Sequence, residues 1–494
     1  MTAERILHVA AEVVPLLKTG GLADVAGALP DALHALGHDV RVLMPGYGAA
    51  IDHARGAGPV HTVAAWDDAR LLETQLPGGC RAWLYETPAF RARGDRPYDG
   101  PDHAPWPDNA QRFDELCRAA TAIAADRLGL DWRPDVVHAH DWHTGLLPVH
   151  LQLARVPAAS VFSIHNLAYR GLFPLGVRAD LRLPGWLEHW QAMELHGELS
   201  FIKGGIAFAD RVSTVSATYA QEITTHGFGE GLEGLLAHRG TALSGITNGI
   251  DTRSWDPATD PVLTTHYDAD EPGGKALARE ALLAETGLEA GRRTPVIAYI
   301  GRLAGQKGVD LLLAALDRLV ALPAVLVVLG DGDPVLRKAL SRAAKARPRR
   351  VYTQFGFDEA MARRIYAGAD MLIMPSRFEP CGLSQLNAMR YGTIPVVHRT
   401  GGLAETVVDT TQATLEDGTA TGFQFDGFTA AALVDAARRA RDWFIKPSRW
   451  RGLVDNAMRR DSSWTRSARE YVSLYRDARE ARFDHLSGKT GPRT

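Results

Sequence analysis

A short glycine-containing phrase occurs twice in this chain, and each copy follows a run of apolar residues. It reads Lys-Thr-Gly-Gly-Leu-Ala-Asp at 18–24 and Arg-Thr-Gly-Gly-Leu-Ala-Glu at 399–405. Paired glycines let a backbone approach a ligand closely, and the amides at a helix N-terminus favour negative charge. Two unrelated strand–turn–helix corners would also produce this pattern. The matching context favours two similar α/β lobes, each with a glycine loop aimed at an anionic ligand.

Length and composition limit the classes of protein to consider. A chain of 494 residues exceeds what one core usually serves, so two or three domains are expected. The net charge of −3 leaves no surplus to neutralise a nucleic-acid backbone, so no nucleic-acid partner is expected. No apolar run approaches the roughly 20 residues that cross a bilayer, and no signal-peptide pattern opens the chain. We therefore expect a cytoplasmic protein without a membrane partner.

Strand and helix patterns alternate in both halves. In the first half strands are expected at 5–11, 40–44, 134–138, 159–163 and 211–215, with a helix at 23–36. In the second half strands are expected at 294–300, 324–329, 351–355, 371–374 and 393–397. Such alternation implies right-handed crossovers and parallel sheets. The fold class is thus α/β, with two doubly wound domains that bind ligands at the carboxyl ends of their strands.

Domain boundaries follow from the composition between the two series. Turn residues gather from 243 onward, so we expect domains at 1–245 and 246–464. The stretch 450–482 is expected to be largely helical, with a frayed tail after about 485. The segment 91–113 is expected to be a long loop, and such loops are usually functional or mobile.

Polar or glycine-rich residues follow five of the expected strands, where open α/β sheets bind ligands. They are Lys18 with Gly20, Gly21 and Asp24; the segment 138–143 with Asp141; His165 with Asn166; Arg302 with Lys307; and the loop 375–383 with Glu379, Cys381, Gly382 and Leu383. Arg302 and Lys307 lie beside glycines directly after a strand. They are either ordinary exposed cations or a diphosphate clamp, and their setting favours the clamp.

Three features have a plainer interpretation. The histidines at 138, 140 and 143 could hold a metal, but no cysteine and a single carboxylate accompany them, so no metal site is predicted. Glu379 could cap the following helix instead of facing a ligand. The Asp-Gly-Asp at 331–333 is expected to turn the chain into a helix that starts at Pro334.

At these residues the chain resembles the bacterial glycogen synthases and plant starch synthases, which are retaining glycosyltransferases of the GT-B fold. The most specific matching segments lie at 18–25, 140–143, 161–169 and 376–383. The resemblance implies two Rossmann-like domains facing a deep interdomain cleft, with a C-terminal helix at about 465–485 packing back on the first domain. It also implies transfer of glucose from ADP-glucose to the non-reducing end of an α-1,4-glucan.

The resemblance also implies roles for individual residues. Lys18 would contact the donor, and Arg302 and Lys307 would hold its diphosphate. His165, Asn166, Asp141 and Glu379 would surround the transferred glucose, with the backbone amides of 381–383 beside it. Glu379, His165, Lys18, Arg302 and Lys307 are the expected catalytic residues. No cofactor or metal is expected, because fixed basic side chains can stabilise the departing diphosphate.

Two other functions stay open from the sequence. One is a related GT-B transferase that uses UDP-glucose or another acceptor. The other is a catalytically silent glucan-binding protein that keeps the fold. The presence of Lys18, Arg302, Lys307 and Glu379 argues against the silent protein.

Overall fold

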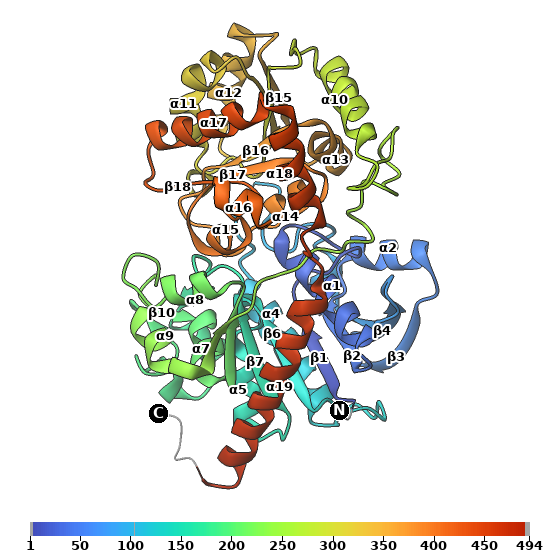
Figure 1. Ribbon diagram of the computed structural model, residues 1–494. Helices are drawn as coiled ribbons and strands as arrows, with labels where there is room; N and C mark the ends of the chain where they lie inside the picture. Colours follow the sequence, from blue (N-terminus) through green and yellow to red (C-terminus); the bar gives the residue numbers. More distant parts are fainter. Residues whose placement is uncertain (1–2, 103, 490–494) are drawn as a thin grey trace. The chain divides into compact units, whose positions relative to one another are not determined.

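The computed structural model describes residues 3–102 and 104–489, and the chain forms two compact units. The first unit runs to Asn248 and takes in the chain again from Trp464, while the second spans Gly249–Ser463. Each unit is built on its own sheet (Figure 1). The chain is therefore a two-domain α/β protein, as its alternating pattern predicts.

The sheet of the first unit has nine strands in the order β12-β11-β7-β6-β1-β2-β5-β4-β3. The strands are β1 Arg5–Val9, β2 Asp39–Pro45, β3 His61–Trp66, β4 Ala69–Gln75, β5 Arg81–Glu86, β6 Val136–His140, β7 Ala159–Ile164, β11 Arg211–Thr214 and β12 Leu243–Gly245. All neighbours pair in parallel except β3 with β4 and β4 with β5. The sequence predicts β1, β2, β6, β7 and β11 but not the antiparallel edge, whose outer strand β3 has no buried residue.

Helices cover both faces of this sheet (Figure 1). They are α1 Gly21–Ala35, α2 Gly48–Ala57, α3 Pro88–Arg91, α4 Asn109–Ala124, α5 Leu146–Leu153, α6 Val177–Asp180, α7 Phe201–Phe208, α8 Ala217–Glu222, α9 Glu233–Arg239 and α19 Trp464–Leu486. A small antiparallel sheet of β8 Leu172–Pro174, β10 Glu198–Ser200 and β9 Glu194–Leu195 completes the unit. Helix α19 packs on β7 and α1, so the end of the chain belongs to the first unit.

The sheet of the second unit has six parallel strands in the order β15-β14-β13-β16-β17-β18. They are β13 Val296–Ile300, β14 Val325–Gly330, β15 Val351–Phe355, β16 Met371–Met374, β17 Ile394–His398 and β18 Phe423–Phe425. Its helices are α10 Gly273–Thr286, α11 Val309–Ala321, α12 Pro334–Ala346, α13 Glu359–Gly368, α14 Ser384–Arg390, α15 Gly401–Thr406, α16 Gln412–Glu416, α17 Ala430–Phe444 and α18 Pro447–Arg459. The expected helical stretch 450–482 is thus two helices, α18 and α19, that belong to different units.

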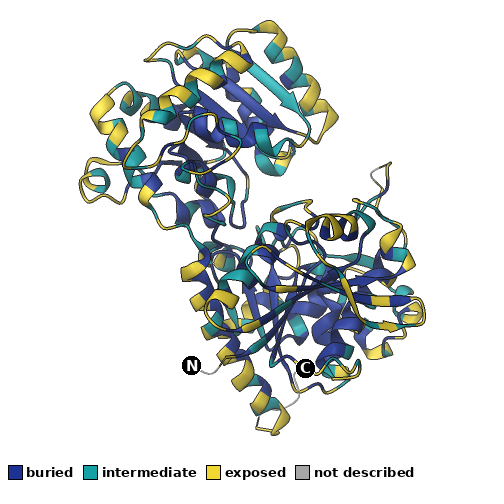
Figure 2. Cartoon of the chain, turned by 90° about the vertical axis from the view of Figure 1, so that its right-hand side faces the viewer, coloured by how far each residue is buried: buried dark blue, intermediate teal, exposed yellow. Residues whose placement is uncertain are grey.

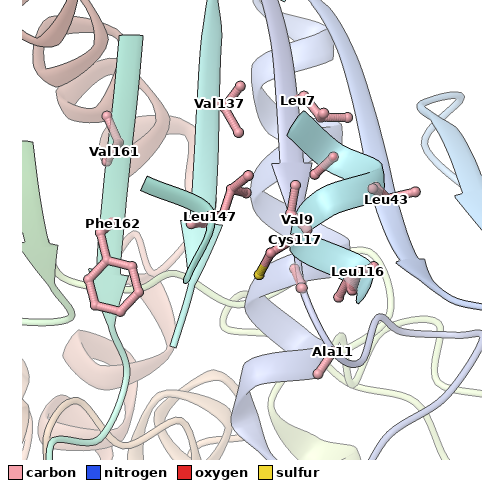
Figure 3. Close-up of a cluster of buried hydrophobic side chains, with 14 of the residues drawn as sticks. Leu7, Val9, Ala11, Leu43, Leu116, Cys117, Val137, Leu147, Val161 and Phe162 are labelled. Atoms are coloured by element: carbon pink, nitrogen blue, oxygen red, sulfur yellow. The ribbon is translucent and has the colours of Figure 1, made fainter. Parts of the chain in front are cut away.

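The central strands are buried on both faces, as Figure 2 shows by their dark colour. In the first unit Leu7 and Val9 of β1 lie beside Val137 of β6, with Leu116 of α4 in the same cluster (Figure 3). Each such side chain contributes roughly 1.5–3 kcal/mol when fully buried. This packing holds the carboxyl ends of the strands in fixed positions, which is where the candidate site residues lie.

Among the described residues, no helix is both long and apolar enough to span a membrane. Of the tail expected after about 485, residues 490–494 lie outside the described residues.

Candidate active site

The first glycine loop connects β1 to helix α1, which begins at Gly21. Lys18 stands on this loop, and its Nζ lies 2.8 Å from Oδ1 of Asp24 on the first turn of the helix. Both side chains are about a quarter exposed. A cation is therefore held beside a helix N-terminus, and water can still reach it.

The amides of this loop already hold an anion, and it belongs to the chain itself. The buried carboxylate of Glu12 accepts hydrogen bonds from the backbone N–H of Thr19 and, at 3.1 Å, of Gly20. Burial raises the pKa of Glu12, while these two hydrogen bonds oppose that shift. We expected the amides to face a ligand anion. The sequence signal that was missed is Glu12, a single carboxylate just after the strand, which is close enough along the chain to bind the amides of the loop.

Asp141 follows β6 in a backbone conformation that is rare for residues other than glycine, with φ of 62°. Its carboxylate accepts a hydrogen bond from the amide of Trp142 at 3.0 Å and is also bonded by the amide of Asn166. Burial raises the pKa of Asp141 to about 8, outweighing these amides, and the charge of Glu12 adds to the shift. Two buried carboxyl groups therefore influence each other at this edge of the sheet.

His165 and Asn166 follow β7, the next strand of the sheet. Nε2 of His165 lies 3.0 Å from Nδ1 of His140, the last residue of β6. Burial lowers the pKa of His165 to about 4, so its ring is neutral at pH 7. Oδ1 of Asn166 accepts a hydrogen bond from the amide of Ala168, which shapes the turn after the strand.

The segment 91–113 was expected to be a loop throughout, but its residues from 109 onward form the start of helix α4. The described part of the loop before that helix is tied to this site. The ring of Tyr98 stacks on that of His143, with ring centroids 4.6 Å apart. The segment is fixed in turn by hydrogen bonds of 3.0 Å from Trp106 Nε1 to the carbonyl of Arg96 and from Asn109 Nδ2 to the carbonyl of Tyr98. It is therefore an anchored part of the site wall.

In the second unit an ion pair joins the residues that follow two neighbouring strands. Nζ of Lys307, after β13, lies 2.6 Å from Oε2 of Glu379, after β16. Oγ of Ser376 donates to the same carboxylate oxygen at 3.0 Å. The Glu379 side chain is 6% exposed and that of Lys307 is 23% exposed, so the cation is the partner that water reaches. Helix α14 has no side-chain cap, so Glu379 does not serve as its N-cap.

Gly308 lets the two loops approach. It adopts φ of 68°, and a Cβ there would lie 1.9 Å from the carbonyl oxygen of Pro375. Only glycine fits a position with both restrictions. Arg302 belongs to the same loop after β13, with Nη2 3.4 Å from Oε1 of Gln306.

The second glycine phrase supports the backbone of Glu379 and does not form a separate anion-binding loop. The amide of Gly402 donates to the carbonyls of Glu379 and Pro380, both at 3.1 Å. A Cβ on Gly401, whose φ is 45°, would lie 2.0 Å from the carbonyl oxygen of Glu379. The two copies of the phrase therefore differ in role, because the partner of each amide is set by what packs against it.

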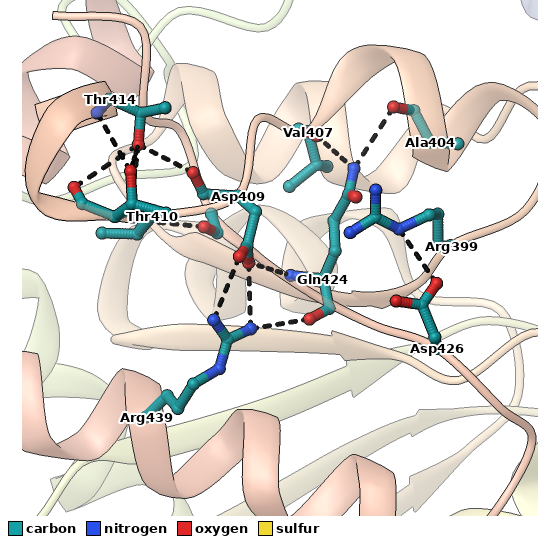
Figure 4. A network of polar contacts seen from close by, with 11 residues as sticks. Arg399, Ala404, Val407, Asp409, Thr410, Thr414, Gln424, Asp426 and Arg439 are labelled. Atoms are coloured by element: carbon teal, nitrogen blue, oxygen red, sulfur yellow. Dashed lines mark hydrogen bonds and ion pairs between the residues drawn. The ribbon is translucent and has the colours of Figure 1, made fainter. Parts of the chain in front are cut away.

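Further contacts hold the second glycine phrase in place (Figure 4). Nε2 of Gln424 donates to the carbonyls of Ala404 and Val407 around the end of helix α15. Asp409, after that helix, accepts two hydrogen bonds of 3.0 Å from the guanidinium of Arg439. The loop bearing Glu379 thus rests on a network that spans three elements.

The backbone at 381–383 is oriented from its other side. Nε2 of Gln385 donates to the carbonyls of Cys381 at 3.0 Å and Gly382 at 2.9 Å. Within the described part of the chain, the amides of Gly382 and Leu383 have no acceptor. Pinned carbonyls and open amides make a backbone suited to bind an oxygen ligand.

The Asp-Gly-Asp at 331–333 is a turn and a helix cap, as predicted. Asp333 accepts hydrogen bonds from the amides of Val335 and Leu336, and Pro334 occupies the first turn of α12.

The structure therefore gathers the predicted residues at two sheet edges, one in each unit. The first set consists of Lys18, Gly20, Gly21, Asp24, Asp141, His165 and Asn166, and the second of Arg302, Lys307, Glu379, Cys381, Gly382 and Leu383. Sequence reasoning missed Glu12, Tyr98 and His8, which contact the first set or its neighbours.

Comparisons with known proteins agree with this arrangement. Residues 5–238 match the starch synthase catalytic domain family, and residues 294–442 match the group 1 glycosyl transferases. The chain is 50% identical over 475 residues to glycogen synthase 1 of Methylococcus capsulatus, covering 96% of each protein. It is 48% identical over 479 residues to the glycogen synthase of Thioalkalivibrio sulfidiphilus, covering 96% of this chain and 99% of that protein.

A solved structure resembles the chain over nearly its whole length. It is the catalytic domain of starch synthase IV from Arabidopsis thaliana bound to ADP and acarbose, with a TM-score of 0.86 and 31% identity. The match covers 97% of this chain and 100% of that one. This likeness confirms the predicted α/β fold of the GT-B class.

Proposed function

The chain belongs to the glycogen and starch synthase family and is a glycosyltransferase, and we propose that it transfers glucose from ADP-glucose to the non-reducing end of an α-1,4-glucan with retention. The names of its relatives support a glucan as the acceptor, and the ADP in the related starch synthase supports the adenine nucleotide. The observation that carries the proposal is the Lys307–Glu379 ion pair of 2.6 Å.

That pair matches the charge that develops during transfer. Breaking the bond between glucose and phosphate leaves positive charge on the sugar ring and negative charge on the departing diphosphate. A cation fixed beside the diphosphate and a carboxylate beside the ring both stabilise the transition state more than the ground state. We assign Lys307 to the diphosphate and Glu379 to the sugar. The contact between the two side chains then sets how far apart the diphosphate and the sugar ring are bound.

Arg302 serves the same diphosphate in this proposal. It follows β13 on the same loop as Lys307, so the two cations come from one rigid strand end. A planar guanidinium binds two phosphate oxygens at once, which a lysine cannot do. Lys18 supplies a third cation from the first unit, and it would exchange Asp24 for a phosphate oxygen.

The first unit supplies the groups that orient the glucose. Asp141 and His165 follow neighbouring strands, and both rest on hydrogen bonds to the protein. With a pKa of about 8, Asp141 carries a proton at pH 7 and can donate a hydrogen bond to a sugar oxygen. The open amides of Gly382 and Leu383 are proposed to bind the donor from the second unit.

Retention is proposed to follow a front-face route. In this route the glucan hydroxyl attacks from the side that the diphosphate leaves, and a leaving-group oxygen takes its proton. Glu379 is held by both Lys307 and Ser376, which suits a fixed charge better than a nucleophile. No metal is assigned to the step, since three basic side chains neutralise the diphosphate.

Donor competition tests the proposal. Purified protein is given glycogen with ADP-glucose or UDP-glucose, and incorporated glucose is measured for each donor. We expect incorporation from ADP-glucose with α-1,4 linkages at the non-reducing ends. A clear preference for UDP-glucose would show that the donor is wrong, and no incorporation from either would favour the glucan-binding alternative.

A further inference from the structure

An unusual row of polar side chains crosses the middle of the first sheet. His8 of β1 stands opposite His138 of β6, and His140 of β6 stands opposite Ser163 of β7. Ser163 in turn stands opposite Ser213 of β11. All five are 0% exposed. Strands buried on both faces are usually apolar throughout, so a polar row there is costly unless its members are hydrogen-bonded.

These side chains form one continuous chain of hydrogen bonds that ends at His165. In order, its links are Ser213 Oγ to Ser163 Oγ at 2.5 Å, Ser163 Oγ to His138 Nε2 at 2.7 Å, His138 Nδ1 to Tyr475 OH at 2.9 Å, Tyr475 OH to His8 Nε2 at 3.3 Å, His8 Nδ1 to His140 Nε2 at 2.9 Å, and His140 Nδ1 to His165 Nε2 at 3.0 Å. Helix α19 contributes Tyr475. We call these seven residues the histidine relay.

Counting hydrogens gives the relay a direction. A neutral imidazole carries one N–H, and each hydroxyl carries one O–H. Seven groups joined by six links therefore leave one hydrogen without a link. Leaving that hydrogen at a buried group such as Ser213 would strand a donor away from water, at a cost of roughly 1–3 kcal/mol. His165 is the one member that is partly exposed. The spare hydrogen therefore belongs on its Nδ1.

The count holds because the imidazoles are neutral. Burial lowers the pKa of His8 to about 3 and that of His165 to about 4. Burial also lowers the pKa values of His138 and His140, and each is lowered further by neighbouring histidines. No extra proton enters the chain at neutral pH.

The spacing within the relay is that of hydrogen bonds and not of a metal site. His8, His138 and His140 offer ring nitrogens that lie within 4.8 Å of one another. Two nitrogens bound to one tetrahedral zinc at about 2.0–2.1 Å would lie about 3.3 Å apart. His8 and His140 approach to 2.9 Å, and the other nitrogen of each is engaged by Tyr475 or His165.

We propose that the histidine relay fixes His165 as the tautomer with hydrogen on Nδ1, so that it donates a hydrogen bond to the transferred glucosyl group from that atom. This inference rests on the proposed function for the identity of the acceptor group. His8, His138, His140 and Tyr475 are then positioning residues, which act through His165 without touching the substrate. Tyr475 couples the C-terminal helix to the site, although it lies 467 positions along the sequence from its hydrogen-bond partner His8.

The wild-type protein tests the tautomer directly and without substrate. Protein labelled with ¹⁵N in its histidine rings is measured by long-range ¹H–¹⁵N correlation NMR, which separates protonated from bare ring nitrogens. The signal of His165 is assigned by its loss in His165→Asn. We expect hydrogen on Nδ1 and a bare Nε2. Hydrogen on Nε2 would overturn the proposal, whatever the enzyme's activity.

The variant Tyr475→Phe tests the coupling, because it removes two links and keeps the ring. We expect His165 to show both tautomers and kcat to fall by about fivefold, the effect of one lost hydrogen bond. The KM for ADP-glucose should stay within about twofold, since the relay orients the sugar and not the nucleotide. The control is Tyr471→Phe, one turn earlier on α19, whose hydroxyl makes none of the six links; it should behave like wild type.

Two outcomes in these variants would count against the relay. Wild-type tautomers and wild-type kcat in Tyr475→Phe would overturn the coupling, as would an equal loss in Tyr471→Phe. If Tyr475→Phe does not fold, the wild-type spectrum decides alone. A wild-type protein that transfers no glucose would overturn the proposed function, and the spectrum would still test the tautomer.

Discussion

Replacing Asp141 by asparagine should stabilise the protein, by an amount that depends on pH. Asp141 is 5% exposed, and burial raises its pKa from 3.8 to about 8. Asparagine keeps the shape of the side chain, and its carbonyl oxygen can accept the hydrogen bond from the amide of Trp142. The variant therefore removes the titratable group and little else.

The size and sign of the effect follow from the two pKa values. Between about pH 4 and pH 8 the folded protein holds a proton on Asp141 that the unfolded chain has lost, so wild-type stability falls as pH rises. Each pH unit in this window is worth about 1.4 kcal/mol. The advantage of Asp141→Asn should be small near pH 4, reach about 4 kcal/mol at pH 7, and level off above pH 8.

Urea unfolding at several pH values between 4.5 and 9 measures this difference. Asp135→Asn is the control with the opposite sign. Burial would raise the pKa of Asp135, but the hydrogen bonds and charge of Arg5 outweigh it and lower the pKa. That variant should be less stable than wild type at pH 7, with the deficit vanishing as pH falls. An advantage of Asp141→Asn that does not change with pH would refute the reasoning.

Two further predictions concern the leaving group. Lys18→Ala, Arg302→Ala and Lys307→Ala should each lower kcat/KM for ADP-glucose. When they are combined, the loss should be smaller than the product of the single losses, because all three side chains serve one diphosphate. A normal kcat and KM in Lys18→Ala would place the first glycine loop away from the donor. Full activity should persist after exhaustive EDTA treatment and dialysis, since fixed cations replace a metal; loss of activity that magnesium or manganese restores would contradict this.

The fold could be predicted wherever local pattern and tertiary environment agree. The strands β15 and β16 have the expected bounds. The apolar run of β16 can form little else between turn residues of an α/β chain, and β15 is rich in β-branched and aromatic residues, which favour strands. The antiparallel edge β3–β5 was missed, because β3 exposes most of its residues and lacks the apolar run of a central strand. The break between α18 and α19 falls between the expected second domain, 246–464, and the expected C-terminal helix at about 465–485.

The site could be predicted only in part. Motifs identified Lys307 and Glu379, but the contact between them joins residues 72 positions apart, and only the folded chain shows it. The two glycine phrases look alike in sequence, yet Glu12 occupies the amides of one, and the other supports Glu379. Partners of this kind depend on packing across the sheet, which local sequence does not record.

We propose that Glu379 acts on the glucose and that Lys307 acts on the diphosphate. The most direct test compares Glu379→Ala with wild type in two measurements: kcat for glucose transfer from ADP-glucose to glycogen, and the dissociation constant of ADP. We expect kcat to fall by about a thousandfold or more, equivalent to about 4 kcal/mol, while the affinity for ADP changes by less than about tenfold. A kcat within about tenfold of wild type, roughly 1.4 kcal/mol, would contradict it.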